Sequence, residues 1–298
     1  MPGKKHPILM VLSLLAAIAL LLVVILTLVS GSSAPPFLTP RERIGVVRIE
    51  GAITDSEPVV TQLVEFRKDK GIKAIVLRID SPGGAVAPSQ EIYWEVKRAA
   101  ASKTVIASMG KVAASGGYYV ACAANKIVAN PGTLTGSIGV IMEFLQLEEL
   151  LKKIGVGVEV LKTGEFKDIG SPHRKLSEKD KELINSLIAD IQRQFVEAVA
   201  RGRNLPLEKV REIADGRILS GAQSKEHGLV DELGNFQDAV DLAKKMTGAE
   251  GEVTLVYPKK RGSILWDFLL RDASEALYSF LRTLPCMQVE YRWEGFTH

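Results

Sequence analysis

A single serine, Ser115, lies where a strand-like run of residues gives way to a helix-like run. Its neighbours are small: Ala113 and Ala114 precede it, and Gly116 and Gly117 follow it. Small neighbours let a substrate backbone approach the hydroxyl, and a glycine directly after the serine can aim its N–H at a developing oxyanion. The segment therefore predicts a nucleophile at a strand-to-helix turn. It is not the G-x-S-x-G elbow, because Ala113 occupies the first glycine position, and a serine that only caps a short helix would fit the same residues.

A serine nucleophile needs a base, and histidine is the most frequent one. The chain has four histidines, which are His6, His173, His227 and His298. His6 precedes a long apolar run, His298 is the last residue, and His227 belongs to the predicted end of a helix. Only His173, which follows Ser171-Pro172 in a predicted loop, could complete a Ser-His-Asp triad.

A lysine serves as the base instead when burial keeps its amine neutral. Most lysines here belong to charged, solvated helices, but Lys167 lies in a loop over residues 163–172, directly after the strand-like Val158–Leu161. Loops at the ends of strands are where catalytic sites are usually built. An ordinary loop lysine beside Glu165 and Asp168 fits the same composition, so these residues alone leave the base open.

Strand-like and helix-like runs alternate around Ser115. Runs rich in apolar and β-branched residues predict strands over Ile44–Ile49, Ala74–Ile79 and Thr104–Ser108. Helical spacing of apolar residues predicts helices over Val59–Lys68, Ser89–Ala101 and Gly116–Ala124, with Ser89 as an N-cap. The second strand leads into a predicted turn, Asp80-Ser81-Pro82-Gly83-Gly84. Such alternation predicts an α/β fold, a parallel sheet with helices on both faces.

The second half of the chain continues this pattern. Glu178–Arg201 is the strongest helix prediction, and Asn235–Met246 predicts a closing helix. Between them a strand–helix–strand return is predicted over Arg217–Leu219, Gly221–Glu226 and Leu229-Val230. The apolar and aromatic run Ile264–Leu270 in the tail fits a helix on a membrane surface or a partner, and equally a helix packed on its own domain.

Composition bounds the function. The chain has 298 residues, of which 46% are hydrophobic and 24% charged, and its net charge of +3 is too small to indicate nucleic acid. Its two cysteines, Cys122 and Cys286, form neither a disulfide framework nor a metal pattern. Because no phosphate-binding Gly-Lys-Ser/Thr loop and no metal-ligand cluster is present in the sequence, we expect no cofactor and no dependence on ATP.

The N-terminal run Pro7–Val29 carries no charge and is mostly Leu, Ile, Val and Ala. Its length suits a bilayer core, whereas the apolar region of a cleaved signal peptide is shorter, roughly 7–15 residues. We therefore expect one retained transmembrane helix in preference to a cleaved signal. Lys4 and Lys5 precede it, so the positive-inside rule favours a cytoplasmic N-terminus and an extracytoplasmic main domain.

Four segments together resemble the signal peptide peptidase A family, which comprises membrane-anchored serine/lysine proteases of the ClpP/crotonase superfamily. They are Arg78–Gly84, Met109–Tyr119, Leu134–Val140 and Gly164–Pro172, and they occur in the order that the family shows. The spacing of Ser115 and Lys167 is also similar to that of single-domain members, and the resemblance covers about residues 44–246.

The resemblance implies a role for each matched residue. Ser115 matches the nucleophile, Lys167 the general base, and Ser137 an accessory serine that hydrogen-bonds the lysine amine. The N–H groups of Gly84 and Gly116 match the oxyanion hole. It further implies a homo-oligomeric ring in which neighbouring subunits complete each substrate pocket.

The expected organisation has four parts: a cytoplasmic N-terminus and anchor over 1–30, a linker over 31–43, the protease domain over 44–258 and a tail over 259–298. The leading hypothesis is an endopeptidase that degrades remnant signal peptides and unfolded apolar polypeptides. Alternatives are a membrane protease partnered with stomatin-like proteins, an acyl-CoA enzyme of the crotonase branch, and a catalytically inactive membrane scaffold. The anchor and Lys167 disfavour the crotonase branch, and intact Ser115 and Lys167 disfavour the scaffold.

Overall fold

The computed structural model describes residues 12, 14–23, 42–258 and 289–292. The chain divides into two units, residues 1–41 and residues 42–298. In the first unit, residues 12 and 14–23 are helical and exposed. Among the described residues, no helix is both long enough and apolar enough to cross a bilayer. The predicted span Pro7–Val29 lies partly outside the described residues.

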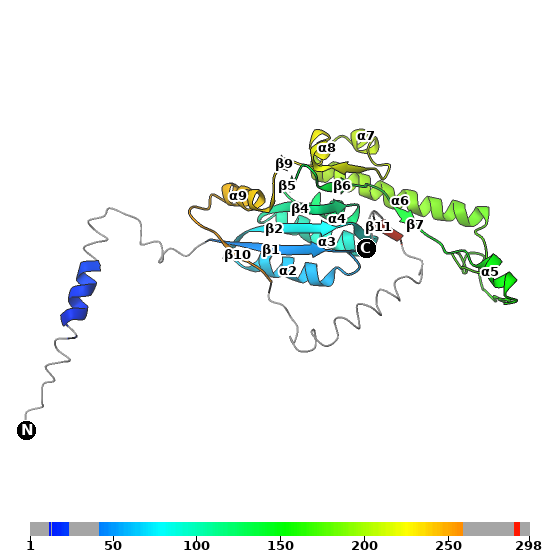
Figure 1. The fold of residues 1–298 in the computed structure, drawn as a ribbon, viewed down its shortest axis with the longest axis horizontal. Helices are drawn as coiled ribbons and strands as arrows, with labels where there is room; N and C mark the ends of the chain where they lie inside the picture. Colours follow the sequence, from blue (N-terminus) through cyan, green and yellow to red (C-terminus); the bar gives the residue numbers. More distant parts are fainter. Residues whose placement is uncertain (1–11, 13, 24–41, 259–288, 293–298) are drawn as a thin grey trace, which may run out of the picture. The chain divides into compact units, whose positions relative to one another are not determined.

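A mostly parallel sheet of eight strands forms the centre of the second unit (Figure 1). Its strands are β1 (Arg43–Glu50), β2 (Ile72–Ser81), β4 (Thr104–Ala114), β5 (Lys126–Ala129), β6 (Leu134–Gly136), β8 (Ile218–Ser220), β9 (Glu232–Leu233) and β10 (Thr254–Val256). Six of them run parallel in the order β10-β1-β2-β4-β5-β9. The end of β4 also pairs in parallel with β6, which pairs antiparallel with β8.

Helices cover both faces of this sheet, as the sequence predicts. They are α2 (Glu57–Lys68), α3 (Val86–Ala100), α4 (Gly116–Ala121), α5 (Glu148–Lys153), α6 (Glu178–Arg203), α7 (Leu207–Arg211), α8 (Gly221–Glu226) and α9 (Phe236–Thr247). Successive side chains of a strand point to opposite faces. Accordingly, Ile75 and Leu77 of β2 join the larger core with α2, α3, α4 and α6, whereas Ala74 and Val76 pack against α9.

Four local predictions are wrong in detail. Ser89 is not an N-cap, because α3 begins at Val86 and the Ser89 hydroxyl instead donates to the Ala85 carbonyl within the first turn. The predicted turn at Asp80–Gly84 is extended: β2 runs to Ser81, and a strand starts at Gly83. Val158–Leu161 forms no strand, since these residues are exposed and no strand pairs with them. Leu229-Val230 is buried in the core but is not a strand.

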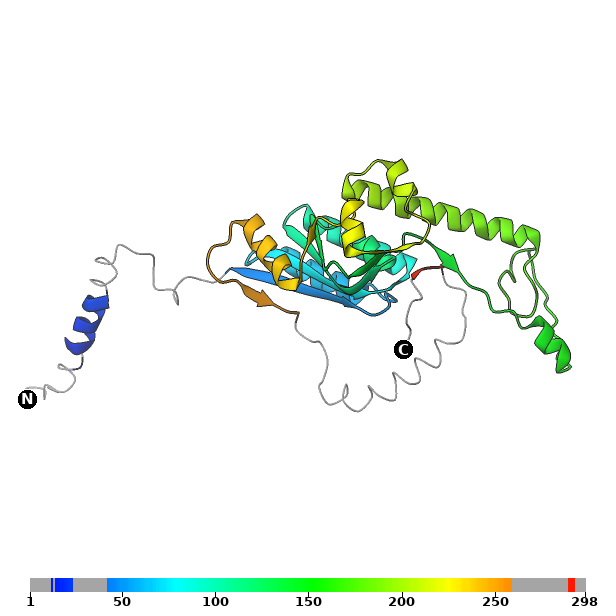
Figure 2. The same cartoon turned by 45° about the horizontal axis from the view of Figure 1, so that its top comes forward.

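The long helix α6 extends beyond the sheet (Figures 1 and 2). Its second half is packed in the core through Phe195 and Val199, while Leu183 and Leu187 in its first half are exposed. It begins with a capping box between Ser177 and Asp180. Residues 143–177, which include α5, lie at the outer end of α6 in both views.

A second, three-stranded antiparallel sheet has the order β3-β11-β7. Strands β3 (Gly83–Ala85) and β7 (Ile141–Met142) flank β11 (Val289–Arg292). Part of the tail predicted over 259–298 thus pairs with the main domain. The predicted apolar segment Ile264–Leu270 lies outside the described residues.

Candidate active site

Ser115 stands at the junction between β4 and α4. Its N–H donates to the Gly136 carbonyl at the end of β6 (2.9 Å), and its own carbonyl accepts the Tyr119 N–H (2.8 Å), which starts the helix. The backbone is forced into the left-handed region, with φ at 51°. A serine in such a conformation costs about 1–3 kcal/mol, and strain of this kind concentrates at functional sites.

The Ser115 hydroxyl is buried and unpaired. The residue is 1% exposed, and its Oγ has no hydrogen-bond partner among the described residues. The side chain does not cap α4, so the structure excludes the interpretation of Ser115 as a simple helix cap. A buried hydroxyl without a partner is costly and rare. Here it is an oxygen left available for chemistry.

Two glycine amides of the predicted oxyanion hole lie beside each other. A Cβ on Gly116 would lie 3.2 Å from the Gly84 amide nitrogen and 2.7 Å from the Ser89 Oγ. Any side chain at Gly116 would therefore push the β3 segment away. Glycine at position 116 lets the start of α4 pack closely against the backbone of Gly83 and Gly84, which carries one of the predicted oxyanion-hole amides.

Two serines that the sequence analysis did not assign to the site support these glycines. The Ser81 hydroxyl accepts the Gly83 N–H (3.1 Å), and the Ser89 hydroxyl donates to the Ala85 carbonyl (2.9 Å). Both hydroxyls are buried. A serine two residues before a glycine is a signal for a local side-chain-to-backbone turn, and it could have identified Ser81.

Ser137 occupies the equivalent place on the neighbouring strand. Ala114 and Gly136 are paired across β4 and β6, so Ser115 and Ser137 each follow a member of that pair. Ser137 also has a positive φ, 48°, and its N–H donates to the Arg217 carbonyl (2.8 Å). The fold therefore brings two strained, buried serines to the carboxyl ends of two neighbouring strands, β4 and β6.

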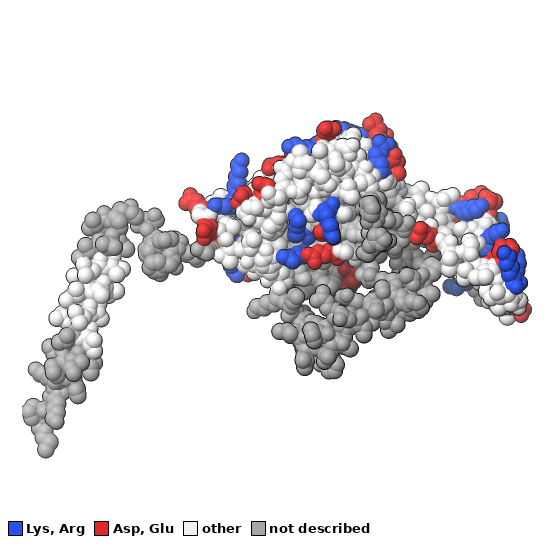
Figure 3. All heavy atoms as spheres, in the orientation of Figure 1, with Lys and Arg blue, Asp and Glu red and all other residues white. Residues whose placement is uncertain are grey.

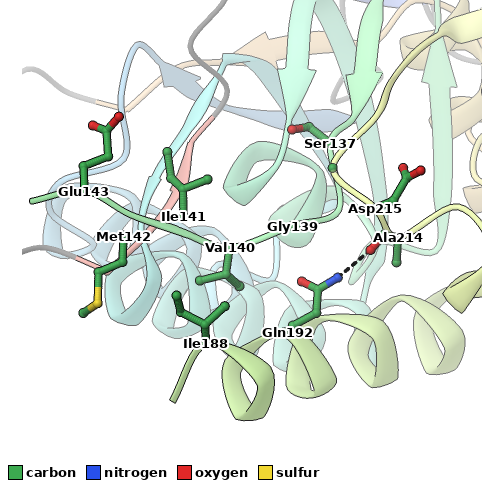
Figure 4. Close-up of a pocket in the computed structure, with 11 residues that line it drawn as sticks. Ser137, Gly139, Val140, Ile141, Met142, Glu143, Ile188, Gln192, Ala214 and Asp215 are labelled. Atoms are coloured by element: carbon green, nitrogen blue, oxygen red, sulfur yellow. Dashed lines mark hydrogen bonds between the residues drawn. The ribbon is translucent and has the colours of Figure 1, made fainter. Parts of the chain in front are cut away.

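A groove of about 770 Å³ opens from Ser137 (Figure 4). The chain from Ser137 to Glu143 borders one side, and Ile188 and Gln192 of α6 border the other. The Gln192 side chain donates to the Ala214 carbonyl (2.8 Å) and so ties α6 to the loop that closes the groove. Both apolar and polar side chains line the groove, including Val140, Ile188 and Asp215.

Lys167 is not brought to Ser115 within one chain. It is exposed, and no hydrogen bond or ion pair of its amine occurs among the described residues. His173, the alternative base, does not reach the Ser115 hydroxyl either, since that oxygen is unpaired. The burial that a neutral lysine needs is absent at this position in the single chain.

The segment that carries Lys167 is tethered by Arg174. Its guanidinium donates to Asp168 (2.8 Å) and to Asp180 at the start of α6 (2.5 Å), and Lys162 also pairs with Asp168 (2.8 Å). The Arg174 hydrogen bond is the main cause that lowers the pKa of Asp180 to about 2, and it lowers the pKa of Asp168 as well. These charge-assisted contacts position the loop against α6.

Arg174→Gln is expected to loosen this segment. Amide hydrogen exchange over residues 164–177 should become faster and peptide turnover should fall several-fold, while chemical labelling of Ser115 should not change. The matched control is Arg193→Gln, which removes two ion pairs on the surface of α6, one with Asp190 and one with Glu197. Equal exchange in both variants would contradict the tether.

The lowered pKa values of Asp168 and Asp180 also determine the pH range over which their contacts with Arg174 hold the segment. Its contribution is fully present above the ordinary carboxyl pKa of about 4 and is lost as the pH falls through the folded value. Ordering of residues 164–177 should therefore be constant above about pH 5 and should decline only in stronger acid.

The surface charge and the potential metal ligands of the described residues do not indicate a further ligand at this site. On the face in Figure 3, basic and acidic side chains are interspersed, with no broad basic surface. Within the part of the chain that the structure describes, no group of three His, Cys, Asp or Glu side chains is placed to hold a metal ion. Cys122 is buried in the core.

Two protein families match this chain, and they and three of its relatives are described as proteases or peptidases. The chain matches peptidase family S49 over residues 97–250 and the Clp protease family over residues 40–133. It is 45% identical over 217 residues to "Putative protease slr0021" of Synechocystis sp., covering 72% of this chain and 78% of that protein. It is 42% identical over 187 residues to "Putative signal peptide peptidase SppA" of Enterococcus faecium, covering 62% and 54%. It is 36% identical over 245 residues to "Serine protease SPPA, chloroplastic" of Arabidopsis thaliana, covering 77% and 36%.

Proposed function

The chain belongs to peptidase family S49, a family of SppA-like serine proteases with a Ser/Lys dyad, and on that premise we propose that it is a membrane-anchored endopeptidase. Ser115 is the nucleophile, Lys167 the general base, and Ser137 the residue that orients the lysine amine. The N–H groups of Gly84 and Gly116 bind the oxyanion. Its substrates are remnant signal peptides and other unfolded apolar polypeptides.

One observation carries this proposal: Ser115 is strained and buried, its hydroxyl has no partner among the described residues, and the glycine after it packs against the backbone of Gly83 and Gly84. This arrangement supports the proposed roles, because acyl transfer needs an attacking oxygen and oxyanion donors around one carbonyl. Covalent labelling of the full chain with a fluorophosphonate tests it. Ser115→Ala should abolish labelling, whereas Ser108→Ala, at a buried serine of the same strand, should retain it. Equal labelling of the two variants would refute the assignment.

The position of Lys167 supports a site completed by a second copy of the chain. The segment that carries it, residues 143–177, exposes many large apolar side chains, as expected for a surface that is covered by a partner. They are Leu145, Leu150, Ile154, Val156, Val158, Val160, Leu161 and Phe166. We therefore propose a ring in which this segment of one subunit supplies Lys167 to the Ser115 of its neighbour.

Mixing two inactive variants tests the ring. Ser115→Ala and Lys167→Ala chains, co-expressed in equal amounts, should recover about a quarter of the wild-type activity, because random assembly joins an intact serine to an intact neighbouring lysine at that frequency. Each variant expressed alone should remain inactive. Co-assembled but inactive mixtures would show that serine and lysine must belong to the same chain.

Membrane anchoring rests on the uncharged run Pro7–Val29 and on the lysines before it. We expect full-length protein in the membrane fraction, resistant to carbonate extraction, with the protease domain accessible to added protease from the extracytoplasmic side. Replacing Leu20 and Leu22 with arginine should release the protein, because charge near the centre of a span is costly. A soluble mature protein that begins near Ala34 would contradict a retained anchor.

A further inference from the structure

Strand β4 changes one of its neighbouring strands before it reaches Ser115. Its earlier part, as far as Met109, pairs with β5, whereas its last part, from Val112, pairs with β6. Because of this changeover, the end of β4 lies beside the end of β6, and the two serines that follow these strands, Ser115 and Ser137, become neighbours in the sheet. The changeover therefore determines where the proposed nucleophile lies relative to the rest of the site.

A bulge lies at the same place, where β4 faces β2. The register between the two strands shifts between Ile79 and Ser81 of β2. Within this shift the one residue Asp80 faces three residues of β4, which are 110–112. Bulges bend a strand locally and often lie next to active sites, where they re-aim a side chain. Here the bulge ends three residues before Ser115.

Two side chains hold the backbone of the bulge. The Asp80 carboxylate accepts the Val112 N–H (3.3 Å), and the buried Thr133 hydroxyl donates to the Gly110 carbonyl (2.7 Å). The packing is close, since a Cβ on Gly110 would lie 3.2 Å from the carboxyl carbon of Asp80. Backbone polar groups in the interior of a sheet need partners, and these side chains supply them where the regular pairing with β2 is interrupted.

Arg78 fixes the part of β4 that precedes the bulge. It lies two residues before Asp80, on the same face of β2. Its guanidinium donates to the Met109 carbonyl (3.3 Å) and to the Ser108 hydroxyl (3.1 Å), and it lies over the ring of Phe236 in α9, 5.8 Å from the centroid. The strand thus enters the bulge from a fixed position, and the contact between Asp80 and Val112 determines how it leaves.

We propose that Asp80 is a positioning residue for the proposed protease reaction. Its carboxylate fixes the bulge through which β4 passes from β5 to β6, and it thereby sets the position of the Ser115 hydroxyl relative to Ser137 and the glycine amides. This inference rests on the proposed function, because it takes Ser115 as the nucleophile. A displacement of about 1 Å at a reacting group can cost about 100-fold in rate. Because Asp80 acts on the bulge and not on a bound substrate, its loss should lower kcat and leave KM unchanged.

The test compares full-length wild type with Asp80→Ala and Asp80→Asn. Asp80→Ala should lower kcat for peptide hydrolysis about 10- to 100-fold, with no change in KM. Asp80→Asn keeps an oxygen acceptor for the Val112 N–H, so it should recover most of this loss. The matched control is Glu50→Ala, which removes the exposed carboxylate opposite Asp80 on β1 and should match wild type. A wild-type kcat in folded Asp80→Ala, or an equal loss in both Asp80 variants, would overturn the inference.

A second pair of variants acts on the same bulge without changing Asp80, and it decides the question if Asp80→Ala does not fold. Thr133→Val keeps the shape of the side chain and removes only the hydroxyl that bonds Gly110. It should also lower kcat with KM unchanged, whereas Thr133→Ser should match wild type. Equal kcat values in folded Thr133→Val and wild type would count against the bulge as the element that positions Ser115.

Amide hydrogen exchange separates this inference from the proposed function, because it does not require activity. Exchange over residues 110–115 should be faster in Asp80→Ala than in wild type and should not change in Glu50→Ala. Identical exchange in Asp80→Ala and wild type would overturn the inference. Failure of the fluorophosphonate to label Ser115 in wild type would instead refute the proposed function, and the exchange result would still show whether Asp80 holds the bulge.

Discussion

Ser115→Ala is expected to reduce kcat/KM for peptide hydrolysis on the order of 10⁴-fold or more, because no acyl-enzyme can form without the hydroxyl. The residual rate would reflect binding and the glycine amides alone. The fold should be preserved, since alanine keeps the Cβ and the lost hydroxyl makes no hydrogen bond within the described residues. Steady-state kinetics with thermal unfolding of the same samples provides the measurement.

Ser115→Gly separates the chemistry from the backbone strain. It should be equally inactive, yet at least as stable as Ser115→Ala. Glycine removes about 1–3 kcal/mol of strain at the positive φ, which exceeds the ~0.4–1 kcal/mol that its extra freedom in the unfolded state costs. Turnover near the wild-type rate in either variant would rule Ser115 out as nucleophile.

Lys167→Ala is expected to cause a loss of similar size, because in the proposed ring the amine of Lys167 from a neighbouring subunit takes the serine proton. Lys167→Arg should not rescue turnover, since an arginine side chain does not deprotonate in proteins.

A neighbouring lysine gives the matched control. Lys179→Arg changes an exposed lysine at the start of α6 that pairs with Glu165, two residues before Lys167. This variant should retain full turnover. His173→Ala tests the other candidate base. Substantial activity in Lys167→Arg, or loss of activity in His173→Ala with Lys167→Ala unaffected, would remove Lys167 from the mechanism.

The layered fold was predictable because its signals are local. The apolar runs at Ala74–Ile79 and Thr104–Ser108 are long enough to indicate strands buried on both faces, and the structure extends both of them. The helix predicted over Glu178–Arg201 from its amphipathic spacing is confirmed, and the structure extends it to Arg203. Errors arose where tertiary contacts override local preference: Leu229 and the β-branched Val230 are apolar, but they pack as a loop in the core.

The turn at Ser115 was also a local prediction. The small residues that indicate it, Ala113, Ala114, Gly116 and Gly117, lie next to Ser115 in the chain. The turn could therefore be predicted without knowledge of distant contacts. The left-handed backbone and the unpaired hydroxyl could not be predicted, since both depend on the hydrogen bond from Ser115 to Gly136 of another strand.

The sequence by itself therefore determined the α/β class and predicted Ser115 as a nucleophile at a strand-to-helix turn, because both predictions depend on residues next to one another. Only the tertiary structure decided the rest. It showed the hydroxyls of Ser81 and Ser89 hydrogen-bonded to the backbone of β3, Lys167 exposed on an outlying segment, and Tyr291 stacked on Tyr119. Strands as short as β3, β7 and β11 carry no periodicity to detect, and their pairing joins residues far apart in the chain. These contacts depend on which strand edges remain unpaired once the main sheet has formed, and a local sequence pattern does not contain this information.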